Sequence, residues 1–366
     1  MQRVTVDSAV EAPSPVSDCS EPYATRNIDV SVIVPCRNEK AYIRRFIECL
    51  TSQSTTRECE YIIADGESDD GTSELLEQWR LANHRIHIIS NPRRIVASGL
   101  NAALAIACGA IIIRMDVHGE YAPDYIDCCV ATLERTGADN VGGPARPIGN
   151  GLIGGAIAAA YSSWFATGGA RFHNSEYEGY VDTVTYGCWK RSAFQEYGNF
   201  DEAFVRNQDD EFNFRIIRAG GRIWQDPQIQ LWYYPRGTLR GLFKQYSQYG
   251  YWKIAVIRKH GAPASWRHLV PAAAIIMNCA LLATAALGAG LGWAPVTKVS
   301  VGVFTIEGLV YAALAVGAAL RAGRRRLGVT LLLPFVFLVY HFAYGLGFLV
   351  ALVRAPQMTS EPPTAS

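Results

Sequence analysis

Two polar clusters near the start of the chain have the residue types to bind a nucleotide. Pro35 is followed by Arg37 and Glu39, and further along Asp65 directly ends a hydrophobic run, with Asp69 after it. A carboxylate at the end of a strand can accept a hydrogen bond from the N–H of a uracil-like base. Acidic turns of this kind also cap the helix that follows them. The second cluster is therefore open to two interpretations, a base-binding carboxylate or a helix cap.

A third cluster pairs Asp116 with His118 and could hold a divalent metal ion. Residues two apart on an extended segment share a face, and a carboxylate with an imidazole can ligate Mn²⁺ or Mg²⁺. The chain has no GxGxxG segment after its first predicted strand and no GxxxxGK[ST] segment, so it lacks a glycine-rich phosphate cradle. A bound diphosphate would then need the ion to screen its charge. The alternative is a strand-end pair with incidental bonds.

A fourth cluster, Asp209 to Glu211, places three successive carboxylates ahead of a helical pattern. Carboxylates at a helix start often do no more than complement the helix dipole. A reaction in which an acceptor hydroxyl attacks an activated group also needs one carboxylate to take its proton. This cluster therefore supplies candidates for a general base.

The elements that must position these clusters follow an alternating pattern. The predicted strands cover residues 29–36, 60–66, 85–90 and 110–119, and the predicted helices cover 40–52, 72–81 and 98–108. This alternation predicts an α/β domain over residues 29–232, a mainly parallel sheet with helices on both faces. In such sheets ligands bind beyond the carboxyl ends of the strands. The first three polar clusters lie at such ends.

The composition changes sharply after the α/β domain. The chain has 366 residues, a net charge of +1 and 49% hydrophobic residues, so no basic excess points to a nucleic-acid partner. After Arg267 the only acids are Glu307 and Glu361. Three apolar stretches, at about 269–291, 299–320 and 329–353 within a membrane region 269–353, have the length of membrane-spanning helices. We expect disordered tails at residues 1–28 and 354–366.

Basic residues before the first stretch and between the second and third predict that the α/β domain is cytoplasmic and the protein multi-pass. Pro334 leaves open whether the third stretch spans the membrane or re-enters. Glu307 and His341 lie inside predicted spans, where ionisable groups are costly. They either line a lipid groove or bond to a neighbouring helix.

Residues 233–268 connect the two parts and carry an amphipathic pattern. Apolar and aromatic side chains recur there at helical spacing, at Leu239, Leu242, Phe243 and Tyr246. Three cations flank them, namely Arg236, Arg240 and Lys244. The pattern favours a helix in the membrane interface, and an ordinary helix packed on the domain is the alternative.

Several motifs together resemble family 2 glycosyltransferases of the GT-A fold. They are SVIVPCRNE, ADGESDDGT, the strand-end DVH and NQDDEFNFR. Four further segments are similar to the bacterial succinoglycan-biosynthesis glucosyltransferase subfamily: NPRRIVASGLNAAL, IIIRMDVHGEYAPDYI, TVTYGCWKR and YYPRGTLRGLFKQY. The resemblance covers about residues 30–258. It implies a GT-A nucleotide-diphospho-sugar transferase domain ahead of the interfacial helix and about three membrane helices.

The resemblance also implies roles for individual residues. Those expected to bind the nucleotide-sugar are Pro35, Arg37, Glu39, Asp65, Asp69 and Asp116. Asp116 and His118 would hold Mn²⁺ or Mg²⁺, although the commoner family pattern has an acid where His118 stands. Asp209 would be the catalytic base, with Asp210 as the second candidate. Those expected near the acceptor or lipid are Gly187, Cys188, Trp189, Arg215, Arg236, Arg240 and Lys244.

The expected function is a membrane-anchored inverting glycosyltransferase of the bacterial inner membrane. It would transfer a hexose, glucose from UDP-glucose, to a polyprenyl-linked saccharide in exopolysaccharide or cell-surface glycan biosynthesis. One alternative is a polyprenyl-phosphate sugar synthase, in which the lipid phosphate is the acceptor. Another is a non-enzymatic membrane scaffold that binds nucleotide sugar or lipid.

Overall fold

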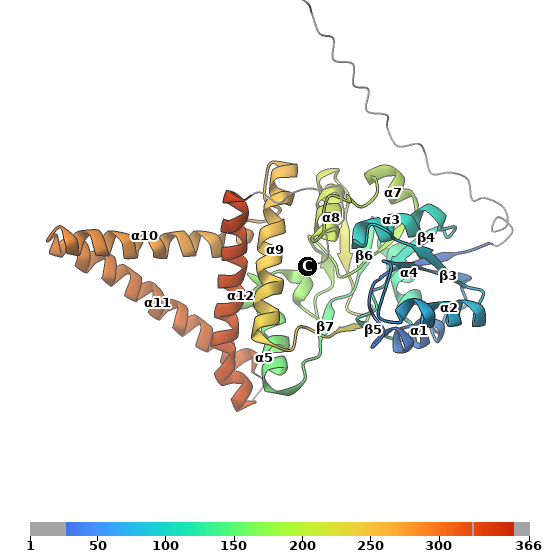
Figure 1. Ribbon diagram of the computed structural model, residues 1–366, viewed down its shortest axis with the longest axis horizontal. Coiled ribbons are helices and arrows are strands. Elements are labelled where there is room, and N and C mark those ends of the chain that lie inside the picture. Colours follow the sequence, from blue (N-terminus) through green and yellow to red (C-terminus); the bar gives the residue numbers. More distant parts are fainter. Residues whose placement is uncertain (1–26, 324–325, 355–366) are drawn as a thin grey trace, which may run out of the picture.

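The computed structural model describes residues 27–323 and 326–354 of the chain. The tails expected at 1–28 and 354–366 fall almost wholly outside these residues. An α/β domain packs at one side against long helices (Figure 1). Both parts of the predicted architecture are therefore present.

The first half of the domain follows the predicted alternation. Its elements are β1 (Val30–Cys36), α1 (Ile43–Thr51), β2 (Cys59–Asp65), α2 (Thr72–Ala82), β3 (Ile86–Ser90), α3 (Val96–Ile106) and β4 (Ile111–Arg114). The four strands are parallel and lie side by side in the order β3-β2-β1-β4. Their carboxyl ends therefore share one edge, as the sequence predicts.

The predicted strand at 110–119 is wrong in its second half. β4 ends at Arg114, and β5 (Gly119–Tyr121) belongs to another sheet. The Tyr121 hydroxyl accepts from the Asp116 amide at 2.7 Å and donates to the Asp116 carbonyl at 3.0 Å. The amide of Gly119 also donates to the Asp116 carbonyl, at 2.9 Å. These bonds turn the chain at Asp116, so the segment that carries Asp116 and His118 is not extended.

The sheet becomes mixed in its second half. The order continues through β9 (Cys188–Lys190), β6 (Asn140–Gly142), β10 (Ile223–Gln225) and β8 (Gly179–Tyr180), with β9 antiparallel to both neighbours. A second sheet has the order β5, β11 (Leu231–Tyr233) and β7 (Ala145–Pro147). It lies at the side of the domain that faces the long helices (Figure 1).

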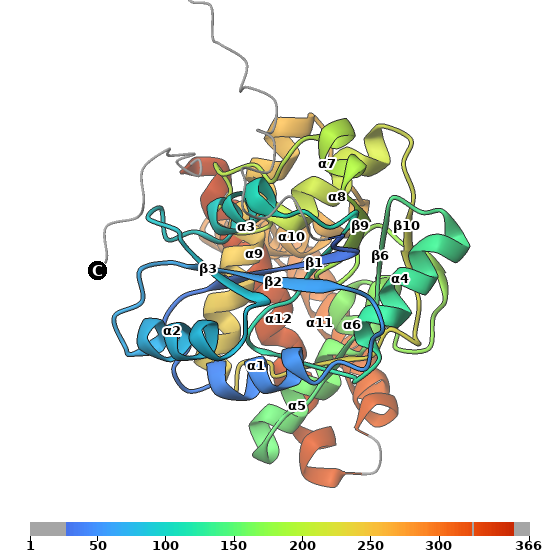
Figure 2. The same cartoon turned by 90° about the vertical axis from the view of Figure 1, so that its right-hand side faces the viewer.

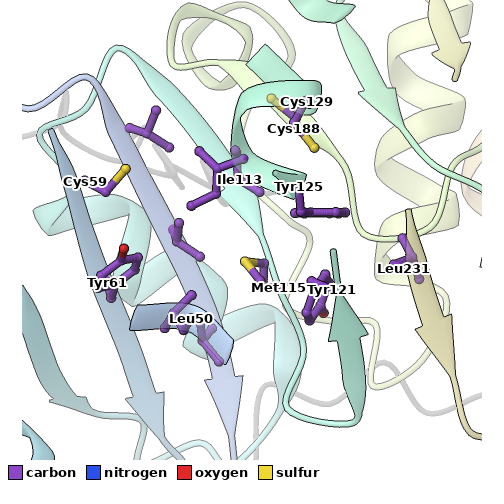
Figure 3. Packing of buried hydrophobic residues seen from close by; sticks show 14 of the residues in the cluster. Leu50, Cys59, Tyr61, Ile113, Met115, Tyr121, Tyr125, Cys129, Cys188 and Leu231 are labelled. Carbon is purple, nitrogen blue, oxygen red and sulfur yellow. The ribbon is translucent and has the colours of Figure 1, made fainter. Parts of the chain in front are cut away.

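Alternate side chains of the strands enter two apolar layers. Val32 and Val34 pack with α1, α2 and α4 (Tyr125–Thr136), whereas Ile33 packs with α3, α7 (Ser192–Tyr197) and α8 (Gln208–Arg218). Figure 2 shows α3, α7 and α8 on one side of the sheet and α1 and α2 on the other. Part of the first layer is drawn in Figure 3. Burial on both faces explains why these strands read as continuous apolar runs.

Four long helices complete the chain. They are α9 (Leu239–His260), α10 (Val270–Gly290), α11 (Ala294–Ala322) and α12 (Leu327–Val353). By length and composition, α10, α11 and α12 could each cross a membrane. α10 and α11 extend away from the domain, whereas α12 lies beside α9 (Figure 1). α12 is one uninterrupted helix through Pro334.

Glycines allow α9 and α12 to approach closely. A Cβ added at Gly250 would lie 2.0 Å from the carbonyl oxygen of Tyr344, and one added at Gly347 would lie 2.0 Å from that of Ser247. Leu242 is buried in the cluster formed with α12 and α5 (Gly151–Tyr161). The amphipathic stripe of α9 is thus partly covered by α12 and α5.

Candidate active site

Loops after β1 and β2 meet at the carboxyl edge of the sheet. The Asn38 side chain donates to Asp69 Oδ1 at 2.9 Å, and the Asp69 amide donates back to Asn38 Oδ1 at 3.0 Å. Gly66 packs so closely that an added Cβ would lie 3.1 Å from the Arg37 side chain. The structure therefore brings together the first two clusters.

Asp65 is buried, and its carboxylate organises its own loop. Oδ1 accepts from the hydroxyl and amide of Ser68 at 2.6 and 3.2 Å, and Oδ2 accepts from the Ser73 hydroxyl at 2.5 Å. A carboxylate oxygen has two acceptor positions. Oδ2 therefore keeps one position for a further donor, so the loop-organising role does not preclude base binding.

Asp116 is held in place by a buried arginine. Arg114 donates from Nε to Asp116 Oδ1 at 2.8 Å and from Nη2 to Oδ2 at 2.9 Å. Burial alone would lower the pKa of the Arg114 guanidinium, but Asp116 outweighs it and the pKa is raised. The Arg114 side chain also lies over the ring of Tyr186, 5.6 Å from its centre. Arg114 is thus a charged residue of the site that the sequence reasoning missed.

His118 faces a different partner from Asp116. Its Nε2 lies 3.1 Å from Glu39 Oε1, and this hydrogen bond raises the pKa of His118 although burial opposes it. Within residues 27–323 and 326–354, no group of three or more His, Cys, Asp or Glu side chains could hold a metal ion. Such a cation is commonly held by one or two carboxylates together with substrate phosphates. An ion held by Asp116 and His118 would therefore need further ligands from a bound diphosphate.

The three carboxylates at the start of α8 have different surroundings. Glu211 is fully buried and bonds Arg215, Lys259 and His260. Asp210 Oδ2 lies 2.5 Å from Lys253 Nζ. Burial would raise the pKa of Asp210, but the charge and hydrogen bond of Lys253 outweigh it and the pKa is lowered. Asp210 is consequently a weak base.

Of the three carboxylates, Asp209 alone forms no ion pair with a described residue. Its Oδ1 accepts from the Asp210 amide at 2.9 Å, and in the described part of the chain it has no ion-pair partner. α8 begins after Asn207, which takes a left-handed backbone conformation at φ +62°. Asp209 therefore keeps a free carboxylate oxygen at the start of the helix.

One cavity of about 1010 Å³ connects these residues with the long helices. The predicted site residues that line it are Asp116, His118, Asp209 and Asp210. α9 contributes Gln245, Tyr249 and Lys253 to its wall. The membrane-type helices contribute further polar side chains, including Asn278, Glu307 and His341. The cavity thus extends from the sheet edge into the group of long helices.

Other predicted acceptor residues lie away from this cavity. Cys188 and Trp189 belong to β9 and are 0% and 1% exposed in the core. Gly187 contacts the site through its carbonyl, which accepts from the Arg114 amide at 3.0 Å. Arg215 bonds Glu211 and the backbone carbonyls of Tyr197 and Asn199, so it ties α8 to the end of α7. Alternation in a strand places side chains in the core whenever both faces are covered, which accounts for Cys188 and Trp189.

The three predicted lipid-contacting cations are exposed and do not line the cavity. They are Arg236, Arg240 and Lys244. The cavity instead contains Lys253, Arg267 and His268. No motif marks these residues, and the only signal in the sequence was their position ahead of the first apolar stretch.

Glu307 and His341 both line the cavity. Glu307 bonds Asn278 and His341 bonds Tyr311, each at 3.0 Å. The interpretation that each bonds a neighbouring helix is therefore confirmed, and the lipid groove stays a prediction.

The architecture is a GT-A-like α/β fold with a mixed sheet. Residues 31–198 match the family described as Glycosyl transferase family 2. The succinoglycan biosynthesis protein ExoA of Rhizobium meliloti (strain 1021) is 32% identical over 319 residues, covering 87% of this chain and 93% of the relative. The chain belongs to glycosyl transferase family 2.

A second relative comes from Methanococcus voltae and is 27% identical over 267 residues, 70% of this chain and 82% of the relative. It is a dolichyl N-acetyl-alpha-D-glucosaminyl phosphate 3-beta-D-2,3-diacetamido-2,3-dideoxy-beta-D-glucuronosyltransferase. Among solved structures, the mannosyltransferase PcManGT from Pyrobaculum calidifontis, in complex with GDP-Man and Mn²⁺, superposes with a TM-score of 0.54. The match has 19% identity and covers 87% of this chain and 88% of that protein, which shows the shared fold. Homologues thus act in exopolysaccharide and lipid-linked glycan synthesis.

Proposed function

We propose that this chain is a membrane-anchored inverting glycosyltransferase that moves glucose from UDP-glucose onto a polyprenyl-linked saccharide. It would work at the cytoplasmic face of the bacterial inner membrane, in exopolysaccharide or cell-surface glycan biosynthesis. The observation that carries the proposal is the single cavity shared by Asp116, Asp209 and helices able to cross a membrane. A soluble donor and a membrane-borne acceptor can meet in such a cavity beside a carboxylate.

The donor nucleotide is assigned to the loops after β1 and β2. Asp65 Oδ2 keeps an acceptor position for a base N–H, as described above. Arg37, Glu39 and Asp69 lie on the same two loops, and Pro35 lies near the end of β1, just ahead of the first loop. Asp116 and His118 would hold a divalent ion with the donor diphosphate, and that ion, when bound, neutralises charge on the leaving group. Arg114 fixes the orientation of the Asp116 carboxylate.

Asp209 is the proposed base. Its free carboxylate oxygen takes the proton from an acceptor hydroxyl, and the hydroxyl oxygen bonds to the anomeric carbon. The bond between that carbon and the diphosphate oxygen breaks at the same time, and UDP leaves with the electron pair. Attack opposite the leaving group inverts the anomeric configuration. Asp209 carries the proton at the end of the step.

A lipid-linked acceptor is supported by two features. The Methanococcus voltae relative is named for a dolichyl-linked sugar phosphate, and the cavity of this chain continues between α10, α11 and α12. The polyprenyl-phosphate sugar synthase is a second candidate, favoured by Lys253 and Arg267 in the same cavity, because a lipid phosphate could itself be the nucleophile there.

The test is a donor screen on the full chain in detergent. UDP or GDP release is measured with UDP- and GDP-sugars, membrane-extracted lipids, and either Mn²⁺ or EDTA. We expect UDP release that depends on lipid and on the metal ion. Product analysis then separates a glycosidic bond from a sugar phosphoester. If no lipid fraction stimulates release of either nucleotide, the proposal is wrong.

A further inference from the structure

Three basic side chains line the cavity near Asp210, and the membrane-type helices line it as well. Lys253 comes from α9, and Arg267 and His268 come from the short helix η2 (Trp266–His268). Each of the two permanent cations is held by an acid: Lys253 lies 2.5 Å from Asp210, and Arg267 bonds Asp182. The cluster is thus preorganised by ion pairs.

The cluster has hydrogen-bonding capacity that the protein leaves unused. An ammonium has three donors and a guanidinium five, whereas Lys253 and Arg267 each bond one carboxylate oxygen among the described residues. Nδ1 of His268 is buried and makes no hydrogen bond to any described residue, and the same holds for Nδ1 of His173, whose pKa is lowered by burial and by nearby Arg267. Buried polar atoms are rarely left without partners. These unused groups point to a ligand.

The chemistry of the unused groups favours an anion. Lys253 is 6% exposed, and the Arg267 side chain is 19% exposed. Burial lowers the pKa of His268 to about 3, with the neighbouring cations contributing, so its imidazole is neutral and has one N–H to donate. A phosphate can accept from an ammonium, a guanidinium and an imidazole together.

Beyond the cluster most of the cavity wall is apolar, although Asn278, Glu307 and His341 also lie there. The apolar part of the wall is formed by Val270, Ala274, Ile275 and Leu282 of α10 and by Leu338 and Phe342 of α12. α10 is a candidate membrane span with mean hydropathy 2.0, and 6% of its hydrophobic window is buried in the protein. A basic, anion-binding site that opens onto a largely apolar wall complements a lipid with a phosphate head.

We propose that Lys253, Arg267 and His268 bind the phosphate of a polyprenyl-type acceptor lipid, whose hydrocarbon chain lies along α10 and α12. The inference rests on the proposed function and assigns its acceptor subsite. It replaces the exposed Arg236, Arg240 and Lys244 as the principal phosphate ligands. Lys253 bonds Asp210, and Asp210 directly follows Asp209 in α8. The proposed phosphate subsite therefore adjoins the proposed base.

The test uses paired substitutions that remove a cation together with its acid. Arg267→Gln with Asp182→Asn deletes the guanidinium without leaving an unpaired buried carboxylate, and Lys253→Gln with Asp210→Asn does the same for the ammonium. Lys190→Gln is the matched control, because Lys190 is an exposed cation on β9 away from the cavity. Calorimetric titration in detergent, with UDP and Mn²⁺ saturating, measures the affinity for farnesyl phosphate, farnesol and inorganic phosphate.

We expect the unmodified protein and the control to bind farnesyl phosphate more tightly than farnesol or inorganic phosphate. Each double variant should bind farnesyl phosphate roughly tenfold more weakly or worse, with farnesol affinity unchanged. Equal farnesyl phosphate affinity in the unmodified protein and both variants overturns the inference. Inorganic phosphate binding as tightly as farnesyl phosphate overturns the lipid source. Separately, absence of UDP binding by the unmodified protein defeats the proposed function itself.

Discussion

The base assignment makes a sharp prediction for Asp209→Asn. Asp209 Oδ1 accepts from the Asp210 amide at 2.9 Å, and the side-chain oxygen of asparagine can accept the same bond. No ion pair is lost, because Asp209 has none among the described residues. The substitution therefore removes a proton acceptor while leaving the start of α8 intact.

The size of the effect follows from the role. General bases contribute about 10²–10⁴-fold to rate, so Asp209→Asn should lower kcat by that factor, or about 3–5 kcal/mol in activation free energy. The KM for donor and the affinity for UDP should remain within a few-fold of the unmodified protein. Asp210→Asn is the comparison: it leaves the Lys253 ammonium without its partner, so it should alter acceptor binding more than the chemical step.

Two assays distinguish a role of Asp209 in proton transfer from a role in donor binding. Nucleotide release with saturating donor and acceptor lipid gives kcat, and calorimetric titration with UDP gives donor affinity. If Asp209→Asn keeps more than about a tenth of the rate, a general-base contribution of that size is refuted. Loss of UDP affinity together with activity would instead assign Asp209 to donor binding.

Three further predictions concern the metal, the helix packing and pH. Asp116→Asn should weaken UDP binding in Mn²⁺ at least roughly tenfold, and Mn²⁺ should restore EDTA-treated unmodified enzyme but not this variant in the release assay. Gly250→Leu should lower the unfolding temperature of the detergent-solubilised protein by several degrees, at a cost of about 1–3 kcal/mol, because its Cβ would meet the Tyr344 carbonyl. Gly302→Leu is its control, since a Cβ there has nothing within 4 Å, and equal destabilisation by both would contradict the packing argument. Burial lowers the pKa of His268 to about 3 from 6.5, so the unfolded chain takes up the proton first and stability falls as pH drops below 6.5. His268→Phe should lessen that fall, by on the order of 1 kcal/mol between about pH 7.5 and about pH 5.5, and an unchanged pH slope of the unfolding temperature would exclude this source.

The fold was predictable where the hydrophobic pattern is long. β1 and β2 are buried on both faces and read as continuous apolar runs, and α10 to α12 carry membrane-length apolar stretches. The second sheet was not predicted, because its three strands have three residues each and show no periodicity. The turn at Asp116 was also missed, since it depends on the Tyr121 hydroxyl returning to that backbone.

The sequence by itself determined the order of strands and helices, the acidic residues at the strand ends and the position of Asp209 and Asp210 at a helix start. It could not determine which of those two carboxylates is free. Lys253, which neutralises Asp210, lies 43 residues further along the chain and arrives only because α9 packs between the domain and α12. The same packing brings Arg267 and His268 into the cavity. Local patterns follow from backbone geometry and burial, whereas the partners of a charged side chain depend on how distant segments pack, and that is decided by the tertiary structure.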